Sequence, residues 1–357
     1  MEKKASRRQK KAPTISDVAE RAGVSAMTVS RVINGEGNVR PATRDAVVAA
    51  IAELNYAPNP AAQSLAGASQ VRIGLLFSNP SAAYLSEFLM GGLDQARLGN
   101  VQLVVEKCEP DDHEADVARA LVANGVNGLI LPPPLCDNRA VIEALLETDT
   151  PAVAVATGEV ANGVSAVSID DYQAAHAMTL HIAQLGHRRI GFILGNPNQT
   201  VSARRFAGYR DALAAIGLPF AEELVVPGLF TYKSGLDAAE RLLDLAEPPT
   251  AIFASNDDMA AATVAVAHRR ALDVPSDLTV CGFDDTALAT AIWPELTTIR
   301  QPIGDMSRAA IDMLLEMVRR HRSGETDQHR QMLLDFTLVR RQSDAAPRKR
   351  PAVPISL

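Results

Sequence analysis

The feature that most limits the fold is a regular alternation, from Val71 onward, of short apolar runs and amphipathic segments of helical length. The apolar runs have the length of buried strands and lie at 72–77, 101–105, 128–132, 152–156, 189–194, 251–255 and 278–283. Such alternation is typical of doubly wound α/β folds, with parallel sheets and crossover helices. These strands are too many for one compact sheet, which predicts two lobes joined near Ile169–Asp171 and Ile299–Ile303. Two facing lobes predict a ligand cleft beyond the carboxyl ends of their strands.

A different pattern occupies residues 14–34. Two short segments flank Gly23, and their apolar residues recur at the spacing of one helix face. These residues are Ile15, Val18, Ala19 and Ala22, then Val29, Val32 and Ile33. Thr14 with Asp17 is typical of a helix N-terminus, and Ser25 can cap the second helix. The pattern favours an all-α helix-turn-helix domain, although a helical hairpin buried in another fold has the same spacing.

The outward face of the second helix is small and polar, which suits a DNA major groove. We expect Arg31 on this face to reach a guanine or a phosphate. A third helix is expected from Pro41 to Tyr56, and its inner face is formed by Val47, Ile51 and Leu54. Arg40 stands where a Ser or Asp cap is usual, so it either holds a phosphate or is a poor cap without a role.

Charge divides the chain into a basic head and an acidic body. Residues 1–67 hold ten Lys or Arg against six Asp or Glu, a net +4; the rest holds 25 against 36, a net −11, and the two give the formal −7. This distribution suits a polyanion-binding module attached to a body that binds no polyanion. The basic run in residues 1–12 predicts a disordered arm, either a solvated tail or a weak phosphate contact.

Residues 56–67, YAPNPAAQSLAG, predict a helix of about two turns. Asn59 can cap this helix, Pro60 suits its first position and Gly67 its end. A helix this short is marginal in water, so we expect it to be ordered only when another surface packs on it. Leu65 projects from its end as an apolar side chain without an obvious partner.

Taken together, these motifs resemble the lactose-repressor (LacI/GalR-type) family of bacterial transcription regulators. The resemblance is carried by DVAERAGVSAMTVSRVING, TRDAVVAAIAELNYAPN and the hinge residues Asn59, Ala62 and Leu65. It implies that two hinge helices of a dimer enter the minor groove, where Leu65 opens the central base step. It also implies that Ala26 and Met27 select operator bases. Neither can form a bidentate hydrogen bond, so thymine methyls and DNA shape are expected to contribute to specificity.

The full set of expected DNA contacts spans the helix-turn-helix and the hinge. It comprises Thr14, Ser25, Ala26, Met27, Thr28, Ser30, Arg31, Asn34, Arg40, Asn59, Ala62, Leu65 and Ala66.

The resemblance also implies an effector cleft in a body like the periplasmic binding proteins. The implied effector-binding residues are Tyr84, Leu85, Ser202, Arg205, Phe230, Asn256, Asp284 and Gln301. Asp284 can accept hydrogen bonds from two sugar hydroxyls, and Arg205 and Asn256 can donate them. For Tyr84, Leu85 and Ser202, ordinary lobe packing is the alternative. Ala156 stands where some sugar-binding relatives carry an aspartate, so the particular sugar stays open.

Enzyme and membrane functions find little support in the sequence. The first strand is followed by SNPSAAYL, which is no phosphate-binding glycine motif, and there is no Walker A sequence or Ser/His/Asp motif. Asp pairs at strand ends are expected to cap helices, and His187 to be structural. The cysteines Cys108, Cys136 and Cys281 lack metal-ligand spacing and predict reduced thiols. We therefore expect no enzyme, no cofactor, no metal and no membrane partner.

The leading hypothesis is a cytoplasmic, nucleoid-associated homodimer, most simply a repressor, that binds a pseudo-palindromic operator and responds to a small carbohydrate. A tail without a leucine heptad favours a dimer. The alternatives are a related regulator that uses a corepressor or activates promoters, a sugar-binding solute-binding protein and a sugar-modifying enzyme. The expected division is an arm at 1–12, helix-turn-helix at 13–57, hinge at 58–69, core at 70–343 (lobe 1 at 70–169 and 303–332, lobe 2 at 170–299 and 333–343) and a disordered tail at 344–357.

Overall fold

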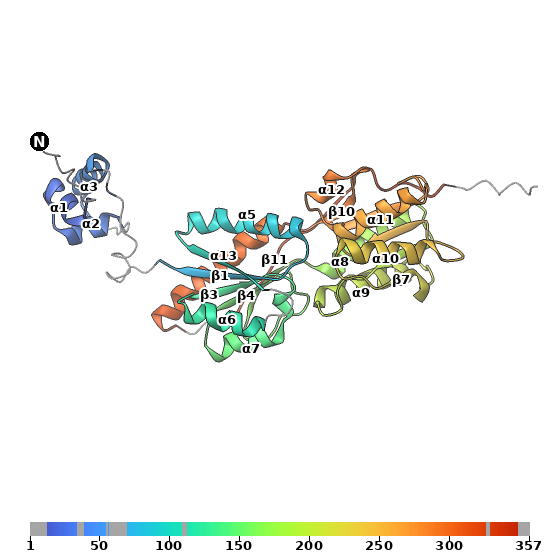
Figure 1. The fold of residues 1–357 in the computed structure, drawn as a ribbon, viewed down its shortest axis with the longest axis horizontal. Coiled ribbons are helices and arrows are strands. Elements are labelled where there is room, and N and C mark those ends of the chain that lie inside the picture. Colours follow the sequence, from blue (N-terminus) through green and yellow to red (C-terminus); the bar gives the residue numbers. More distant parts are fainter. Residues whose placement is uncertain are drawn as a thin grey trace, which may run out of the picture. The chain divides into compact units, whose positions relative to one another are not determined.

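A computed structural model describes residues 13–33, 39–54, 56, 70–108, 113–325 and 329–348. The chain divides into two compact units, Met1–Gln70 and Val71–Leu357, and Figure 1 traces both along the sequence. Among the helices of these described ranges, none has the length and apolar character that crossing a membrane requires.

The first unit is the predicted helix-turn-helix domain, built from α1 (Ile15–Ala22), α2 (Ala26–Ile33) and α3 (Pro41–Leu54). The carboxylate of Asp17 accepts hydrogen bonds from the Thr14 backbone N–H at 2.7 Å and the Thr14 hydroxyl at 2.8 Å, which completes a capping box. Ser25 accepts from the Thr28 N–H at 3.2 Å, as its sequence position predicts. Val18 and Val29 are fully buried in the small core between the helices.

The second unit contains two six-stranded sheets, which confirms the predicted two-lobed α/β architecture. The sheet of lobe 1 is entirely parallel, in the order β11-β5-β4-β3-β1-β2. Its strands are β1 (Arg72–Phe77), β2 (Gln102–Lys107), β3 (Gly128–Leu131), β4 (Ala152–Val155), β5 (Ser165–Ser168) and β11 (Gln331–Leu333). The inner strands β1, β3, β4 and β5 are mostly buried, whereas the side chains of both edge strands, β2 and β11, are exposed or half-buried.

The sheet of lobe 2 has the order β12-β10-β9-β8-β6-β7, with β12 antiparallel to β10 and all other pairs parallel. Its strands are β6 (Ile190–Ile193), β7 (Val225–Val226), β8 (Ala251–Ala254), β9 (Thr279–Asp284), β10 (Thr297–Arg300) and β12 (Thr337–Val339). The chain therefore passes between the lobes three times, after β5, after β10 and between β11 and β12.

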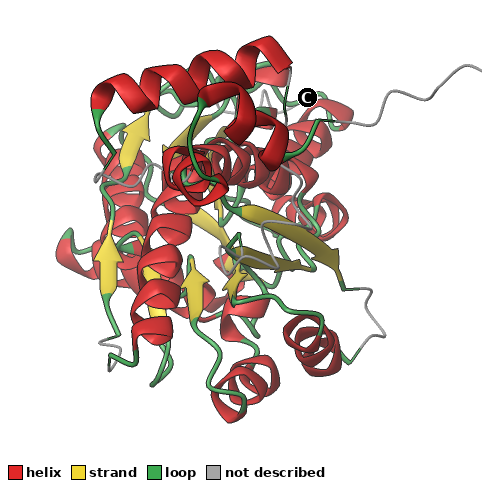
Figure 2. Cartoon of the chain, turned by 90° about the vertical axis from the view of Figure 1, so that its left-hand side faces the viewer, coloured by secondary structure: helices red, strands yellow, loops and turns green. Residues whose placement is uncertain are grey.

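Helices cover both faces of each sheet, as Figures 1 and 2 show. In lobe 1, α5 packs beside α13 and α6 beside α7; in lobe 2, α8 packs beside α9 and α10 beside α11. Their bounds are α5 (Ala82–Leu98), α6 (Glu114–Ala123), α7 (Arg139–Glu147), α8 (Asp171–Gln184), α9 (Thr200–Ala215), α10 (Tyr232–Leu243), α11 (Asp257–Arg269), α12 (Leu288–Ala291) and α13 (Ile303–Ser323). Short 3₁₀ turns lie at Leu135–Asp137 and Glu222–Leu224.

Residues 344–348 differ from the disordered tail that the sequence predicts from 344, because they pack on lobe 2. The buried carboxylate of Asp344 accepts hydrogen bonds from the Thr297 hydroxyl at 2.6 Å and the His181 Nε2 at 2.9 Å. The Ala345 carbonyl accepts from the His187 Nε2 at 2.8 Å. Polar partners from α8, from β10 and from the loop before β6 hold this segment, and composition alone gives no sign of them.

Candidate functional site

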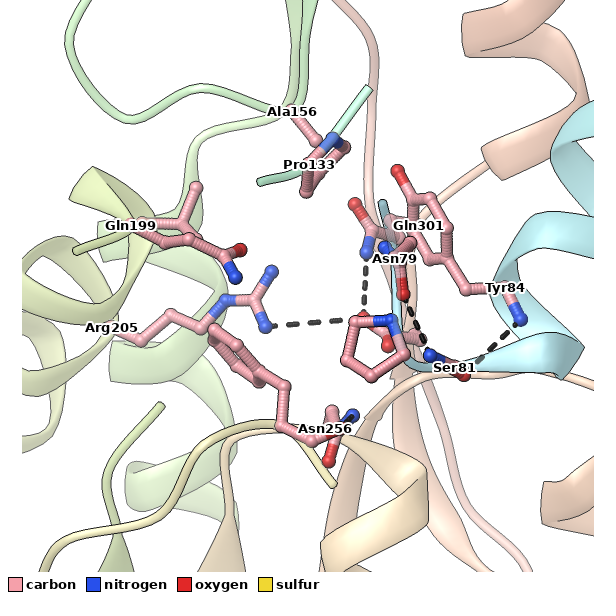
Figure 3. Close-up of a pocket in the computed structure, with 13 residues that line it drawn as sticks. Asn79, Ser81, Tyr84, Pro133, Ala156, Gln199, Arg205, Asn256 and Gln301 are labelled. Atoms are coloured by element: carbon pink, nitrogen blue, oxygen red, sulfur yellow. Dashed lines mark hydrogen bonds and ion pairs between the residues drawn. The ribbon is translucent and has the colours of Figure 1, made fainter. Parts of the chain in front are cut away.

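A cavity of about 30 Å³ lies between the two lobes, beyond the carboxyl ends of the strands (Figure 3). Lobe 1 contributes the residues before and within the first turn of α5, and lobe 2 those at the start of α9 and α11. The lining residues are Asn79, Pro80, Ser81, Tyr84, Pro133, Ala156, Gln199, Val201, Arg205, Phe230, Asn256, Asp284 and Gln301. A volume of this size holds about two water molecules.

Arg205 projects from α9 and is fixed on several sides. Its Nε donates to the Asp171 carboxylate at 2.7 Å, and its Nη1 donates to the Ser255 carbonyl at 2.6 Å. The guanidinium carbon lies 3.6 Å from the ring centroid of Phe283, which is a cation–π distance. The pKa of Asp171 is raised by burial, while the charge of Arg205 acts in the opposite direction. Arg205 is thus a rigid donor at the cavity wall.

Asp284 ends β9 and faces Arg205 across 3.9 Å, measured from its Oδ1 to the Arg205 Nη1. The same oxygen accepts from the Gln301 side-chain amide at 2.6 Å. Burial raises the pKa of Asp284 to about 7, against the opposing effects of Arg205 and the Gln301 hydrogen bond. Near neutral pH this carboxyl group therefore changes between an acceptor and a donor.

Asn256 and Phe230 form a second wall. The Asn256 carbonyl oxygen caps α11 by accepting from the Met259 N–H at 3.0 Å, and its amide donates to the Phe230 carbonyl at 3.1 Å. A Cβ added at Gly195 would collide with the Phe230 ring and the Ser202 hydroxyl, so glycine there leaves space for the ring. The wall offers an apolar ring beside amide groups.

Two buried polar atoms at the cavity have no hydrogen-bond partner among the described residues: the Tyr84 hydroxyl and the Gln301 Oε1. Tyr84 and Gln301 are 4% and 2% exposed. Burial also raises the pKa of Tyr84 well above its ordinary value, so the phenol stays protonated. Because an unpaired buried polar group costs about 1–3 kcal/mol, both atoms favour a polar ligand.

Six of the eight residues proposed from the sequence line the cavity: Tyr84, Arg205, Phe230, Asn256, Asp284 and Gln301. The other two, Leu85 and Ser202, do not. Leu85 is half-buried one position beyond Tyr84 on α5. The Ser202 hydroxyl donates to the Asn196 carbonyl at 2.6 Å, so it supports a turn.

Six further lining residues were not among those expected from the sequence: Asn79, Pro80, Ser81, Pro133, Gln199 and Val201. Pro133 follows β3, and Asn79 follows β1. Because ligands bind beyond the carboxyl ends of parallel strands, the position of these residues after a strand was a usable signal.

In the first unit, the outward face of α2 is exposed to solvent. Met27 is 66% exposed, and Ala26 and Arg31 are also exposed. Thr28 and Ser30 are half-buried, and Thr14, Ser25 and Arg40 are exposed. Asn34, Asn59, Ala62, Leu65 and Ala66, together with the expected hinge helix, lie outside the described residues.

Residues 14–59 match the family described as bacterial regulatory proteins, lacI family, and residues 179–343 match the periplasmic binding protein-like domain. The chain is 35% identical over 309 residues to catabolite control protein A of Priestia megaterium, across 86% of this chain and 93% of the relative. This chain belongs to the lacI family of bacterial regulatory proteins. It is a DNA-binding transcription regulator and not an enzyme.

Two solved structures of lacI-family proteins share the fold. A complex of the transcriptional regulator CelR with cellobiose has a TM-score of 0.70 and 32% identity, covering 93% of this chain and 99% of that chain. The lac repressor dimer bound to operator and the anti-inducer ONPF has a TM-score of 0.75 and 30% identity, covering 94% of this chain and 100% of that chain.

Proposed function

We propose that this lacI-family protein is a repressor that binds a pseudo-palindromic operator as a homodimer and is controlled by a small carbohydrate. The observation that carries the effector half is the cavity in which Arg205, Asp284 and Gln301 meet beside two unpartnered polar atoms. The cellobiose complex of CelR and the operator complex of the lac repressor support the two halves by similarity. The protein acts on the bacterial chromosome and is therefore placed in the cytoplasm, at the nucleoid.

For operator binding, we propose that the exposed face of α2 makes the base contacts. In this proposal Met27 contacts base edges and Arg31 a guanine or a phosphate; their exposure on α2 supports these roles. The hinge residues Asn59, Ala62, Leu65 and Ala66 complete this surface in the proposal, and their support is the sequence motif.

In this proposal, effector binding alters operator binding by changing the angle between the lobes. An effector that binds one lobe arrangement better by about 1–3 kcal/mol changes operator affinity roughly 5–150-fold. The short hinge segment at 58–69 is the proposed responsive element, because a helix of two turns is marginal without a packing surface.

The test separates the two halves with one variant in each unit. An operator is obtained by selecting bound duplexes from a random pool, and its affinity is measured by fluorescence anisotropy with and without sugars. Arg205→Ala is expected to keep operator binding and lose the sugar response. Met27→Asp places a negative charge on the DNA face and is expected to lose operator binding by 100-fold or more while sugar binding is kept. Equal loss of both activities in either variant contradicts the proposal.

A further inference from the structure

We infer that the effector is an uncharged polyhydroxylated molecule and that the cleft excludes sugar phosphates and sugar acids. This inference rests on the proposed function and narrows the ligand class of the same cleft.

The positive charge available at the cavity is already neutralised. Among the described residues that line it, Arg205 is the basic group and Asp284 the acidic group. Asp171 stands behind Arg205 at 2.7 Å and is 3% exposed, so the guanidinium has a buried ion-pair partner before any ligand arrives. Phosphate recognition ordinarily uses an arginine cluster or unpaired donors, because an anion must be compensated when it loses its water.

Additional carboxyl groups lie next to residues that line the cavity or begin its helices. Asp258 on α11 accepts from the Ser81 hydroxyl at 2.7 Å, and Asp257 beside it is fully buried and accepts from the Thr298 hydroxyl at 2.7 Å. Asp137 of lobe 1 lies at the start of α9. These carboxyl groups supply no cation to a phosphate or carboxylate on the ligand.

Helix N-termini favour anions, and α5, α9 and α11 all begin at the cavity. Here one first-turn amide of each helix is already used. The Thr200 N–H at the start of α9 donates to Asp137 at 2.9 Å, and the Met259 N–H of α11 donates to Asn256 at 3.0 Å. For α5 the Tyr84 N–H donates to the Ser81 hydroxyl at 3.3 Å. These three amides are therefore not free to bind an anionic group of a ligand.

The remaining groups fit neutral hydroxyls. Hydroxyl protons can be accepted by Asp284 and by the Gln301 Oε1, which has no partner among the described residues. The Tyr84 hydroxyl, equally without a partner there, can donate to a ligand oxygen. The Phe230 ring gives an apolar surface on which the C–H face of a sugar ring can lie. An uncharged polyol can form hydrogen bonds with these polar atoms and adds no charge to the cavity.

The experiment is titration calorimetry on the full chain with matched compounds. The probes are glucose, glucose 6-phosphate and glucuronate; ribose and ribose 5-phosphate; cellobiose; and the uncharged base adenine. A neutral sugar is expected to bind, and its phosphate or acid to bind at least about 100-fold more weakly. A phosphate or acid that binds as tightly as its parent sugar overturns the inference. Tight binding of adenine with no sugar binding also overturns it.

Operator anisotropy in the same solutions separates this inference from the proposed function. An anionic sugar that binds and shifts operator affinity overturns the inference and leaves the proposed carbohydrate control intact. If no compound binds and none shifts operator affinity, the effector half of the proposed function fails and the inference fails with it.

An isosteric variant tests the electrostatic reason. Asp284→Asn is expected to weaken binding of the neutral sugar by about 10- to 100-fold, because a charged acceptor is lost. It is also expected to lower, at least fivefold, the ratio between the dissociation constant of the sugar phosphate and that of its parent sugar. Asp312→Asn removes the same charge from the exposed face of α13 and is expected to leave both values unchanged. A ratio that Asp284→Asn does not change overturns the inference.

Discussion

Three residues at the cavity hold left-handed backbone conformations that residues with side chains rarely adopt. Ala156, Phe230 and Asp284 have φ values of 54°, 58° and 109°. Such conformations cost about 1–3 kcal/mol each and persist only where the surrounding structure imposes them. At Asp284 the hydrogen bond from Gln301 and the nearby Arg205 fix the carboxylate in that position. At Asp284 the strained backbone therefore belongs to a residue whose carboxyl group lines the cavity.

The raised pKa of Asp284 predicts a pH dependence of stability. In the folded protein this pKa is about 7, against an ordinary value of 3.8. Between about pH 4 and 7 the folded chain thus binds a proton that the unfolded chain has released. The free energy of unfolding should fall as pH rises through this window, by at most about 1.4 kcal/mol per pH unit from this group. Burial is the main cause of the raised pKa; the charges of Asp258 and Asp171 raise it further, and Arg205 and the Gln301 hydrogen bond lower it.

Urea unfolding at pH 5, 6, 7 and 8 checks this dependence. Asp284→Asn is expected to become more stable relative to the unaltered chain as pH rises from 5 to 8. Asp312→Asn, on the exposed face of α13, should give a curve parallel to that of the unaltered chain. A parallel curve for Asp284→Asn would mean that its pKa is ordinary.

At the scale of elements, apolar composition explains which strands were predictable. The seven apolar runs form β1, β2, β3, β4, β6, β8 and β9. By contrast, β5 is SAVS and β10 is TTIR, and their Ser165, Thr297 and Thr298 are buried with hydrogen-bond partners from distant segments. A polar strand of this kind has no apolar signature. Its burial depends on partners that only the folded chain brings together.

In the candidate site, too, the sequence pattern predicted some features and only the packing of the folded chain decided others. The segments that reach the cavity were predictable, and six of the eight proposed residues line it, but the choice between neighbouring helix positions was not predictable. On α5 the cavity takes Tyr84 and not Leu85, and on α9 it takes Val201 and not Ser202. Neighbouring helix positions point about 100° apart, so an error of one residue turns a side chain away from the site.

The segment 343–348 is an element whose removal has a predictable cost. Burial opposes ionisation of Asp344, but hydrogen bonds from His181 and Thr297 and the charge of Arg340 keep its pKa below the ordinary value. Asp344→Ala leaves these donors without their acceptor and should lower the free energy of unfolding by about 1–3 kcal/mol. Urea unfolding followed by circular dichroism measures this loss. The exposed Asp312→Ala is the control, and equal stabilities for the two variants would contradict a structural role for the segment.

At the scale of the whole second unit, hydrogen bonds between the lobes lie on two sides of the cavity. On one side the Asp137 carboxylate of lobe 1 accepts from the Thr200 backbone N–H and the Thr200 hydroxyl of lobe 2, both at 2.9 Å. The Gly158 N–H adds a bond to the same hydroxyl at 2.8 Å. On the other side Ser81 donates to Asp258 at 2.7 Å. These contacts hold the lobes together around a cavity that has room for about two waters.

We expect an effector to enter when the lobes separate, because a sugar ring is larger than the space between them in this arrangement. Asp137→Ala removes the acceptor of three hydrogen bonds, including one from the Thr157 hydroxyl at 2.6 Å. We expect faster effector association, about tenfold, and a larger radius of gyration in small-angle scattering without ligand. The reason is that less free energy is needed to open the lobes. Thr200→Val, which removes the hydroxyl but keeps the helix N–H, should have a smaller effect in the same direction.

Asp116→Ala is the matched control, because Asp116 pairs with Arg119 on the exposed surface of α6 within lobe 1. It should change neither association nor scattering. Association is measured by stopped-flow mixing with the neutral sugar that binds in calorimetry. If Asp137→Ala slows association and leaves the radius of gyration unchanged, the bonds to Thr200 belong to the ligand-accepting arrangement instead. Lobe separation would then not be the step that limits entry.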